Sequence, residues 1–220
     1  MRFSLCRRLV LAVIAGLSPL AGASAPPNIV LILADDLGYG DVSCYQPTSR
    51  IKTPHLDRMA AEGMRFTDAH SPSTVCTPTR YSLLTGRMAF RTGMRGVFDG
   101  AGGPCLIEEG RLTLGSMLQD RGYHTALVGK WHIGLTFFDE AGNPICENGL
   151  SAVRRIDHSR RLTDGPLNRG FDEFFGTACC PTTDWLYAFI EGDRIPVPPT
   201  GILDRSGLPT HDYSRDNRPG

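Results

Sequence analysis

The sequence predicts an α/β layered fold, and three observations support this fold class. An apolar, branched run at Asn28–Ala34 is typical of a strand that is buried on both faces of a parallel sheet. Thr53 and Pro54 are a capping residue and a first-turn proline, and Gly63 is a stop signal, so these residues predict a helix. The expected elements then follow as strand, helix, strand, helix, helix and strand, which is the alternation of an α/β protein.

The elements after this first helix are expected to be short. Met64–Ala69 is the second expected strand, and a helix is expected over Pro78–Gly86. Thr113 caps the next expected helix, which stops at Gly122, and a strand is expected over His124–Val128. Beyond these elements the periodicity is poor. Only two later segments are expected to pack, Phe171–Phe175 and Trp185–Ile190.

The first 25 residues have the order of a secretory signal peptide. Three arginines precede the apolar run Leu9–Leu17, and the small residues Ala21–Ala25 follow it. Pro19 interrupts the apolar stretch, which is too short for a membrane span. We therefore expect residues 1–25 to be cleaved, with no stable membrane span afterwards. The expected location is the periplasm or the extracellular space, or the secretory compartment or lysosome in a eukaryote.

Composition and charge exclude some function classes. Hydrophobic residues make up 41% and charged residues 21%, which is ordinary for a soluble globular protein. Lys plus Arg and Asp plus Glu each number 23, so the formal net charge is zero. Nucleic-acid-binding proteins usually carry a basic excess, and no nucleic-acid partner is expected.

The cysteine pattern does not predict a disulfide scaffold. Six cysteines follow the signal peptide, at positions 44, 76, 105, 146, 179 and 180. Cys179 and Cys180 are adjacent, and adjacent cysteines rarely bond each other. If Cys76 has a chemical role, five cysteines remain, and a fully paired framework is impossible.

Asp35 and Asp36 are the first candidate site residues, because they end the first expected strand. In open α/β sheets, ligands bind outside the carboxyl ends of the strands. Two adjacent carboxylates there provide hard oxygen ligands for Ca²⁺ or Mg²⁺. The alternative interpretation is a turn in which one aspartate caps the next element.

Cys76 and Arg80 are the second candidate group. Cys76 opens an expected helix, and Arg80 lies one turn further along the same face, so the guanidinium is expected beside the sulfur. A helix N-terminus together with an arginine favours an anion at that position. The alternative is a small buried cysteine with a surface arginine.

Lys130 and His132 form the third group, directly after the last expected strand. Alternation points both side chains to one side if the extended conformation continues. The lysine offers a point charge for an anionic oxygen, and the histidine can donate a hydrogen bond or transfer a proton. Taken by themselves, such residues are more often simply on the surface.

Together these segments resemble the sulfatase family. Cys76–Arg80 (CTPTR), followed by Leu83 to Arg87 (LLTGR), is similar to the sulfatase signature C-x-P-x-R with its trailing L-x-T-G-R. The resemblance covers the chain in family order from about Pro26 to Ile133, with a weaker continuation at Gly170–Gly176. The other matching blocks are NIVLILADDLGYG at 28–40, TPHLDRMAAEGMRF at 53–66 and GKWHIG at 129–134.

The resemblance implies an alkaline-phosphatase-like fold, with a mixed, mainly parallel sheet flanked by helices. Residues 26–220 are then expected to be the N-terminal part of a sulfatase catalytic domain, incomplete at the C-terminus. Family members normally supply a further Asp-Asn metal-ligand pair, a histidine and a lysine from a later part of the chain. Asp216 and Asn217 lie in a polar tail with no strand before them, so they are not assigned to that pair.

The resemblance also implies a chemistry, that of a sulfuric ester hydrolase acting on an aryl or a carbohydrate sulfate. A formylglycine-generating maturation enzyme is expected to oxidise Cys76 to formylglycine. Asp35, Asp36 and the modified Cys76 are implied as ligands of a divalent metal, Ca²⁺ in preference to Mg²⁺. The remaining implied roles are orientation of the formylglycine hydrate by Arg80, sulfate binding by Lys130, and hydrogen bonding and proton removal by His132.

Two alternatives remain open at this stage. The first is a phosphonate or phosphate ester hydrolase of the same superfamily, because formylglycine and the metal also serve phosphoryl chemistry. The second is a non-catalytic truncated fragment that binds anions without turnover. Because about half of the family's site is assigned, the 220 residues alone are expected to turn over sulfate esters poorly.

Overall fold

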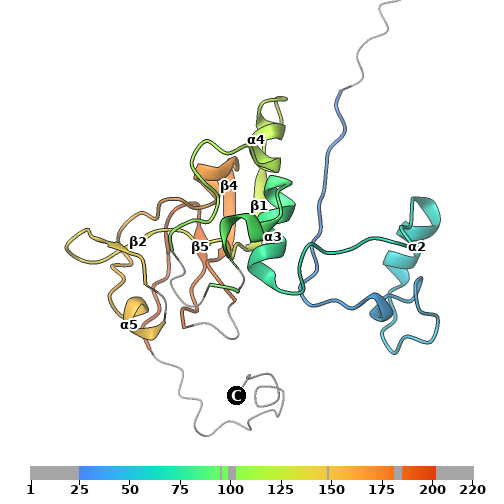
Figure 1. Cartoon of the computed structure of the whole chain (residues 1–220), viewed down its shortest axis with the longest axis horizontal. Coiled ribbons are helices and arrows are strands. Elements are labelled where there is room, and N and C mark those ends of the chain that lie inside the picture. Colours follow the sequence, from blue (N-terminus) through green and yellow to red (C-terminus); the bar gives the residue numbers. More distant parts are fainter. Residues whose placement is uncertain (1–24, 95, 99–102, 148, 181–184, 202–220) are drawn as a thin grey trace, which may run out of the picture. The chain divides into compact units, whose positions relative to one another are not determined.

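The structure is a computed structural model (Figure 1), and it divides the chain into two units, Met1–Met64 and Arg65–Gly220. It describes residues 25–94, 96–98, 103–147, 149–180 and 185–201. The expected signal peptide, except Ala25, and the Asp216-Asn217 pair therefore lie outside the described residues. Among the helices that the structure describes, none is long and apolar enough to cross a membrane.

The first unit contains the 3-10 helix η1 (Tyr39–Asp41) and the helix α2 (Pro54–Glu62). The predicted helix is confirmed, with Pro54 in the first turn and Gly63 directly after the last residue. The Gly63 N–H donates to the Met59 carbonyl at 2.9 Å and closes the final turn. Pro54 and Gly63 therefore act as predicted, whereas the side chain of Thr53 makes no capping hydrogen bond.

Two predicted strands do not form. Asn28–Ala34 has no strand assignment, and its apolar side chains are exposed, from 42% at Leu33 to 82% at Val30. Met64–Ala69 also lacks a strand, and Phe66 is 63% exposed. A strand needs hydrogen bonds from a neighbouring strand, and for Asn28–Ala34 no strand lies within the described part of the first unit. The apolar pattern of a strand is present in both segments without the pairing that defines one.

The second unit contains a three-stranded mixed sheet with the order β1-β4-β5. Strand β1 (Ala126–Lys130) pairs in parallel with β4 (Glu173–Thr177), in the register Ala126↔Glu173 to Lys130↔Thr177. Strand β5 (Ile190–Glu191) pairs antiparallel with β4. The strand predicted over His124–Val128 is confirmed with a shift of two residues, and the α/β class is confirmed by this sheet and its helices.

Helices α3 (Cys76–Thr85) and α4 (Leu114–Gln119) lie to one side of this sheet in Figure 1. Helix α3 begins at Cys76, two residues before the predicted start, and ends where Gly86 adopts a left-handed conformation with φ 64°. Thr113 caps α4, since its Oγ1 accepts a hydrogen bond from the Ser116 N–H at 3.1 Å. Both predicted helices are therefore confirmed.

The remaining elements of this unit are short. Figure 1 shows α5 and the β2–β3 hairpin on the other side of the sheet from α3. Their bounds are Phe137–Phe138 for β2, Pro144–Ile145 for β3, Leu150–Val153 for α5, Ala89–Thr92 for the 3-10 helix η2 and Pro166–Arg169 for η3. The two-residue strands contribute little by themselves, so this side depends on side-chain packing.

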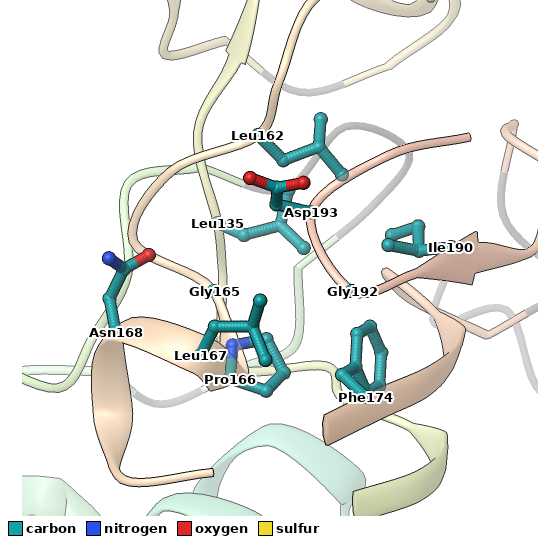
Figure 2. A pocket seen from close by; sticks show the side chains of 10 residues that line it. All are labelled: Leu135, Leu162, Gly165, Pro166, Leu167, Asn168, Phe174, Ile190, Gly192 and Asp193. Atoms are coloured by element: carbon teal, nitrogen blue, oxygen red, sulfur yellow. The ribbon is translucent and has the colours of Figure 1, made fainter. Parts of the chain in front are cut away.

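The core of the second unit is built around one continuous buried segment, 131–137, which directly follows β1. Trp131, Ile133, Leu135 and Phe137 are each no more than 1% exposed. A small pocket beside this segment is shown in Figure 2, where Leu135 and Phe174 are among the lining side chains. Its volume of about 10 Å³ holds at most one water, so this pocket is a packing gap and not a substrate site.

Candidate active site

The first turn of α3 places Cys76 and Arg80 at the edge of the core. Val75 before it is extended, and Pro78 lies in the first turn, where a helix leaves backbone N–H groups without an intrahelical partner. Thr77 and Pro78 are buried, whereas Cys76 and Arg80 are half-buried. The helix is thus anchored through one face, and its reactive side chains remain accessible.

Lys130, the last residue of β1, contacts this turn directly. Its Nζ donates a hydrogen bond to the Cys76 Sγ at 3.1 Å. Arg80 in turn donates from Nη1 to the backbone carbonyl of Lys130. The structure therefore brings together three of the predicted site residues, Cys76, Arg80 and Lys130.

The end of β1 is fixed by an unusually close approach of two glycines. Gly129 and Gly176 are register partners in the parallel pair β1–β4. A Cβ atom on Gly176 would lie 1.7 Å from the Gly129 carbonyl oxygen, so only glycine fits there. This contact sets the backbone immediately before Lys130, and hence the position from which the lysine reaches Cys76.

The backbone conformation of His132 differs from the extended one considered from the sequence. The predicted alternation required a continued extended backbone, and this condition is not met at His132, which is left-handed with φ 57°. Its N–H donates to the Ala178 carbonyl at 2.8 Å, and its carbonyl accepts from the Thr77 hydroxyl at 2.7 Å. His132 is 1% exposed. The histidine thus contacts α3 through its backbone.

The side chain of His132 has a defined hydrogen-bond role. Its Nε2 lies 2.7 Å from the backbone carbonyl oxygen of Phe98. A carbonyl oxygen only accepts hydrogen bonds, so Nε2 carries the proton in this contact. In the neutral imidazole, Nδ1 is then the acceptor atom. This Nδ1 atom is fully buried.

The charges around Cys76 favour an anion. The Nζ of Lys130 lies at the sulfur, and Arg80 is in the following turn of the same helix. The N-terminus of a ten-residue helix adds the partial positive charge of its backbone N–H groups. Two cationic side chains and a helix N-terminus make this position suitable for a tetrahedral oxyanion.

Asp35 and Asp36 belong to the first unit, and Cys76 belongs to the second. Both are exposed, and Asp36 is left-handed with φ 55°. The described residues contain no group of three or more His, Cys, Asp or Glu side chains placed to hold a metal ion. The donor chemistry of two adjacent carboxylates fits a hard divalent cation, while the remaining ligands are not assembled in the described residues.

The other cysteines of the sequence form no disulfide in the described residues, and Cys179 belongs to the packed interior. Cys179 is buried, and its carbonyl accepts from the Thr177 hydroxyl at 2.8 Å. No disulfide joins any of the six cysteines within the described ranges.

Thr77 is the residue of this site that sequence reasoning missed. Its side chain is fully buried and contacts His132, which lies 55 positions later. A hydroxyl in the first turn between a candidate nucleophile and a proline was the available signal. That signal does not name a partner so distant in sequence.

Several curated proteins are similar to this chain. Human arylsulfatase A is 50% identical over 132 residues, which is 59% of this chain and 24% of that protein. Human arylsulfatase H is 40% identical over 159 residues, or 70% of this chain and 25% of that protein. The N-acetylgalactosamine-6-O-sulfatase of Bacteroides thetaiotaomicron is 46% identical over 112 residues, or 51% and 22%. The chain thus spans about a quarter of the length of these relatives.

Solved structures and a family model agree with these relatives. A Bacteroides thetaiotaomicron structure, from a genetic locus for glycosaminoglycan metabolism, superposes with a TM-score of 0.64 at 33% identity. The superposition covers 78% of this chain and 32% of the Bacteroides chain. The structure of Ps i-CgsB, with a TM-score of 0.57 and 24% identity over 80% and 38% of the two chains, supports the fold alone. The model of the Sulfatase family matches residues 27–191, and the chain therefore belongs to the sulfatase family.

Proposed function

We propose that this chain carries the nucleophile and three of its supporting side chains in a sulfuric ester hydrolase. The observation that carries the proposal is the contact of the Lys130 Nζ with the Cys76 Sγ, one helical turn from Arg80. A cation at the sulfur of the C-x-P-x-R cysteine suits the binding of a sulfate group at that position. Relatives named as sulfatases favour sulfate over phosphate or phosphonate esters.

The proposed nucleophile is a formylglycine made from Cys76 by a maturation enzyme. The Sγ atom in this structure stands in for the oxygen of that residue. Formylglycine supplies, as its hydrate, a hydroxyl for attack on sulfur and a second hydroxyl whose loss of a proton expels sulfate. Arg80 orients residue 76, and Lys130 donates to an oxygen of the transferred group. His132 accepts the proton at Nδ1, since its Nε2–H is committed to the Phe98 carbonyl.

A divalent metal is also proposed, with Asp35, Asp36 and residue 76 among its ligands. Ca²⁺ is preferred over Mg²⁺ as the ion. The metal supplies charge neutralisation for the oxygens of the sulfate group. The carboxylates hold it through hard oxygen donors, which both ions accept.

The proposal also covers the substrate class and the location of the protein. The relatives are named for aryl sulfates and for N-acetylgalactosamine-6-O-sulfate, so the substrate is proposed to be an aryl or carbohydrate sulfate. The signal-like residues 1–25 support export. The described mixed sheet is proposed to belong to a larger, mainly parallel sheet of the alkaline-phosphatase type, with residues 26–220 as its N-terminal part.

The test begins with the modification. The natural protein that carries this sequence is co-expressed with a formylglycine-generating enzyme, and the peptide containing residue 76 is weighed by mass spectrometry. We expect the loss of sulfur and the gain of an aldehyde, followed by faster hydrolysis of an aryl sulfate than of the matching aryl phosphate. A retained thiol, or preferential phosphate hydrolysis, would overturn the proposal.

The metal is tested separately by calorimetric titration with CaCl₂ and with MgCl₂. Asp35→Asn and Asp36→Asn each remove one charged ligand, and we expect each to weaken metal binding by about tenfold or more. Asp68→Asn, an exposed aspartate, is the control. Equal metal affinity in the parent and both ligand variants would show that Asp35 and Asp36 are not metal ligands.

A further inference from the structure

The buried hydroxyl of Thr77 takes part in a closed ring of three hydrogen bonds. Its Oγ1 donates to the His132 carbonyl at 2.7 Å. The His132 Nε2 donates to the Phe98 carbonyl at 2.7 Å, and the Phe98 N–H donates back to the Thr77 Oγ1 at 3.4 Å. Each of the three residues therefore donates one bond and accepts one.

This ring restrains a strained residue. A left-handed φ of 57° is unfavourable for a residue with a Cβ. Such a conformation persists only where the surrounding contacts enforce it. For His132 these contacts are the Ala178 carbonyl at its N–H, Thr77 at its carbonyl and Phe98 at its ring.

Thr77 is also part of the helix turn that carries the nucleophile. It follows Cys76 directly, and its side chain is 0% exposed, so its hydroxyl cannot reach a substrate in solvent. The Thr77 hydroxyl therefore links the turn that holds residue 76 to the backbone of His132. Through Phe98, it also links that turn to the His132 ring. A shift of either side would break at least one bond of the ring.

We propose that Thr77 is a positioning residue, which fixes the ring orientation and tautomer of His132 relative to residue 76 without touching the substrate. This inference rests on the proposed function, in which His132 accepts a proton at Nδ1. Thr77 prepares that step because it holds Phe98 where the Phe98 carbonyl keeps the proton on Nε2. One hydroxyl group thereby fixes the positions of both the proposed nucleophile and the proposed proton acceptor.

The main test compares Thr77→Val, which keeps the shape but removes the hydroxyl, with Thr77→Ser, which keeps the hydroxyl. Thr92→Val is the matched control, because the Thr92 hydroxyl also donates to a carbonyl, that of Ala89, and accepts from a backbone N–H, that of Met94. Formylglycine content is measured by mass spectrometry, and aryl sulfate turnover is normalised to it. We expect Thr77→Val to lower kcat by about 10-fold to 100-fold with KM within about twofold. Thr77→Ser should stay within about threefold of the parent, and Thr92→Val should match it.

A second measurement does not depend on turnover. Nitrogen-15 NMR of the imidazoles reports the tautomer of each of the six histidines, and His132→Gln identifies the His132 signals. We expect the Nε2–H tautomer in the parent and in Thr77→Ser, and a mixture of tautomers in Thr77→Val. An inactive, unmodified parent with these NMR results would contradict the proposed function and leave the positioning role supported. An unchanged tautomer and unchanged kcat in Thr77→Val, or equal losses in the Ser and Val variants, would overturn the inference.

Discussion

The Lys130 Nζ lies 3.1 Å from the Cys76 Sγ, although the two residues are 54 positions apart in the sequence. One residue ends a strand and the other begins a helix, so the contact depends on how β1 and α3 end. The contact places a cation against the proposed nucleophile, and it gives the lysine a role that its charge alone would not define.

Lys130→Met is predicted to lower kcat/KM for an aryl sulfate by about 100-fold to 1,000-fold, which is typical of losing one donor to a developing oxyanion. Methionine keeps much of the aliphatic stem, so the melting temperature should change little. Lys52→Met, at the other lysine of the sequence, is exposed and serves as the control. A Lys130→Met enzyme with parental kcat/KM would show that the lysine does not contact the transferred group.

Gly176→Ala tests the close approach that positions Lys130. Because its Cβ would lie 1.7 Å from the Gly129 carbonyl oxygen, β4 must move away from β1. We expect a destabilisation of about 3 kcal/mol or more in urea unfolding, together with a loss of turnover. Gly96→Ala is the control, since a Cβ at that residue meets nothing within 4 Å and its φ is not positive. Equal stability of the two variants would contradict this packing.

Helices were predicted better than strands, because helix signals are local. Pro54, Gly86 and Thr113 each act on residues within one turn, and the structure uses all three as the sequence indicated. Asn28–Ala34 had the composition of a strand, but a strand also needs a neighbour, which composition does not specify. Strand existence therefore depends on pairing that a single segment does not contain.

The position of β1 shows the same limit at finer scale. The prediction began at His124, whereas the strand begins at Ala126. Thr125 instead binds Asp172: its N–H and its hydroxyl donate to the Asp172 Oδ2 at 2.7 Å and 2.9 Å. For the site, motif resemblance selected Cys76 and Lys130, while the link from Thr77 to His132 required the folded chain.

Cysteine reactivity provides a third prediction. Burial raises the pKa of the Cys105 thiol above its ordinary value, and a hydrogen bond from the Ile107 backbone and the charge of Arg169 only partly oppose the effect, whereas Cys146 is exposed. Because the thiolate is the reactive form, iodoacetamide at pH 8 should alkylate Cys146 at least about tenfold faster than Cys105. Peptide mass spectrometry over a time course measures both rates in one sample. Labelling of Cys105 as fast as Cys146 would show that its burial is not maintained in solution.

The contact between Asp172 and Thr125 predicts how stability changes with pH. Hydrogen bonds from the Thr125 N–H and hydroxyl, with a further bond from Gln119, hold the pKa of Asp172 below its ordinary value of 3.8. A carboxylate with a depressed folded-state pKa stabilises the protein above its unfolded pKa, and this contribution is lost as the pH falls through the folded value.

Asp172→Asn should therefore lower the melting temperature at pH 7, where the parent carboxylate is ionised, and the difference should shrink below about pH 4. Asn keeps the shape and one acceptor oxygen but loses the charge and one of the two acceptors that Gln119 and Thr125 use, so the pH dependence of the difference reports the charge. Asp120→Asn, at an exposed aspartate directly after α4, is the control and should follow the parent at every pH. Melting curves of the three proteins between pH 2 and pH 7 measure the effect. A constant difference between Asp172→Asn and the parent across this range would mean that the loss comes from geometry and not from the ionised carboxylate.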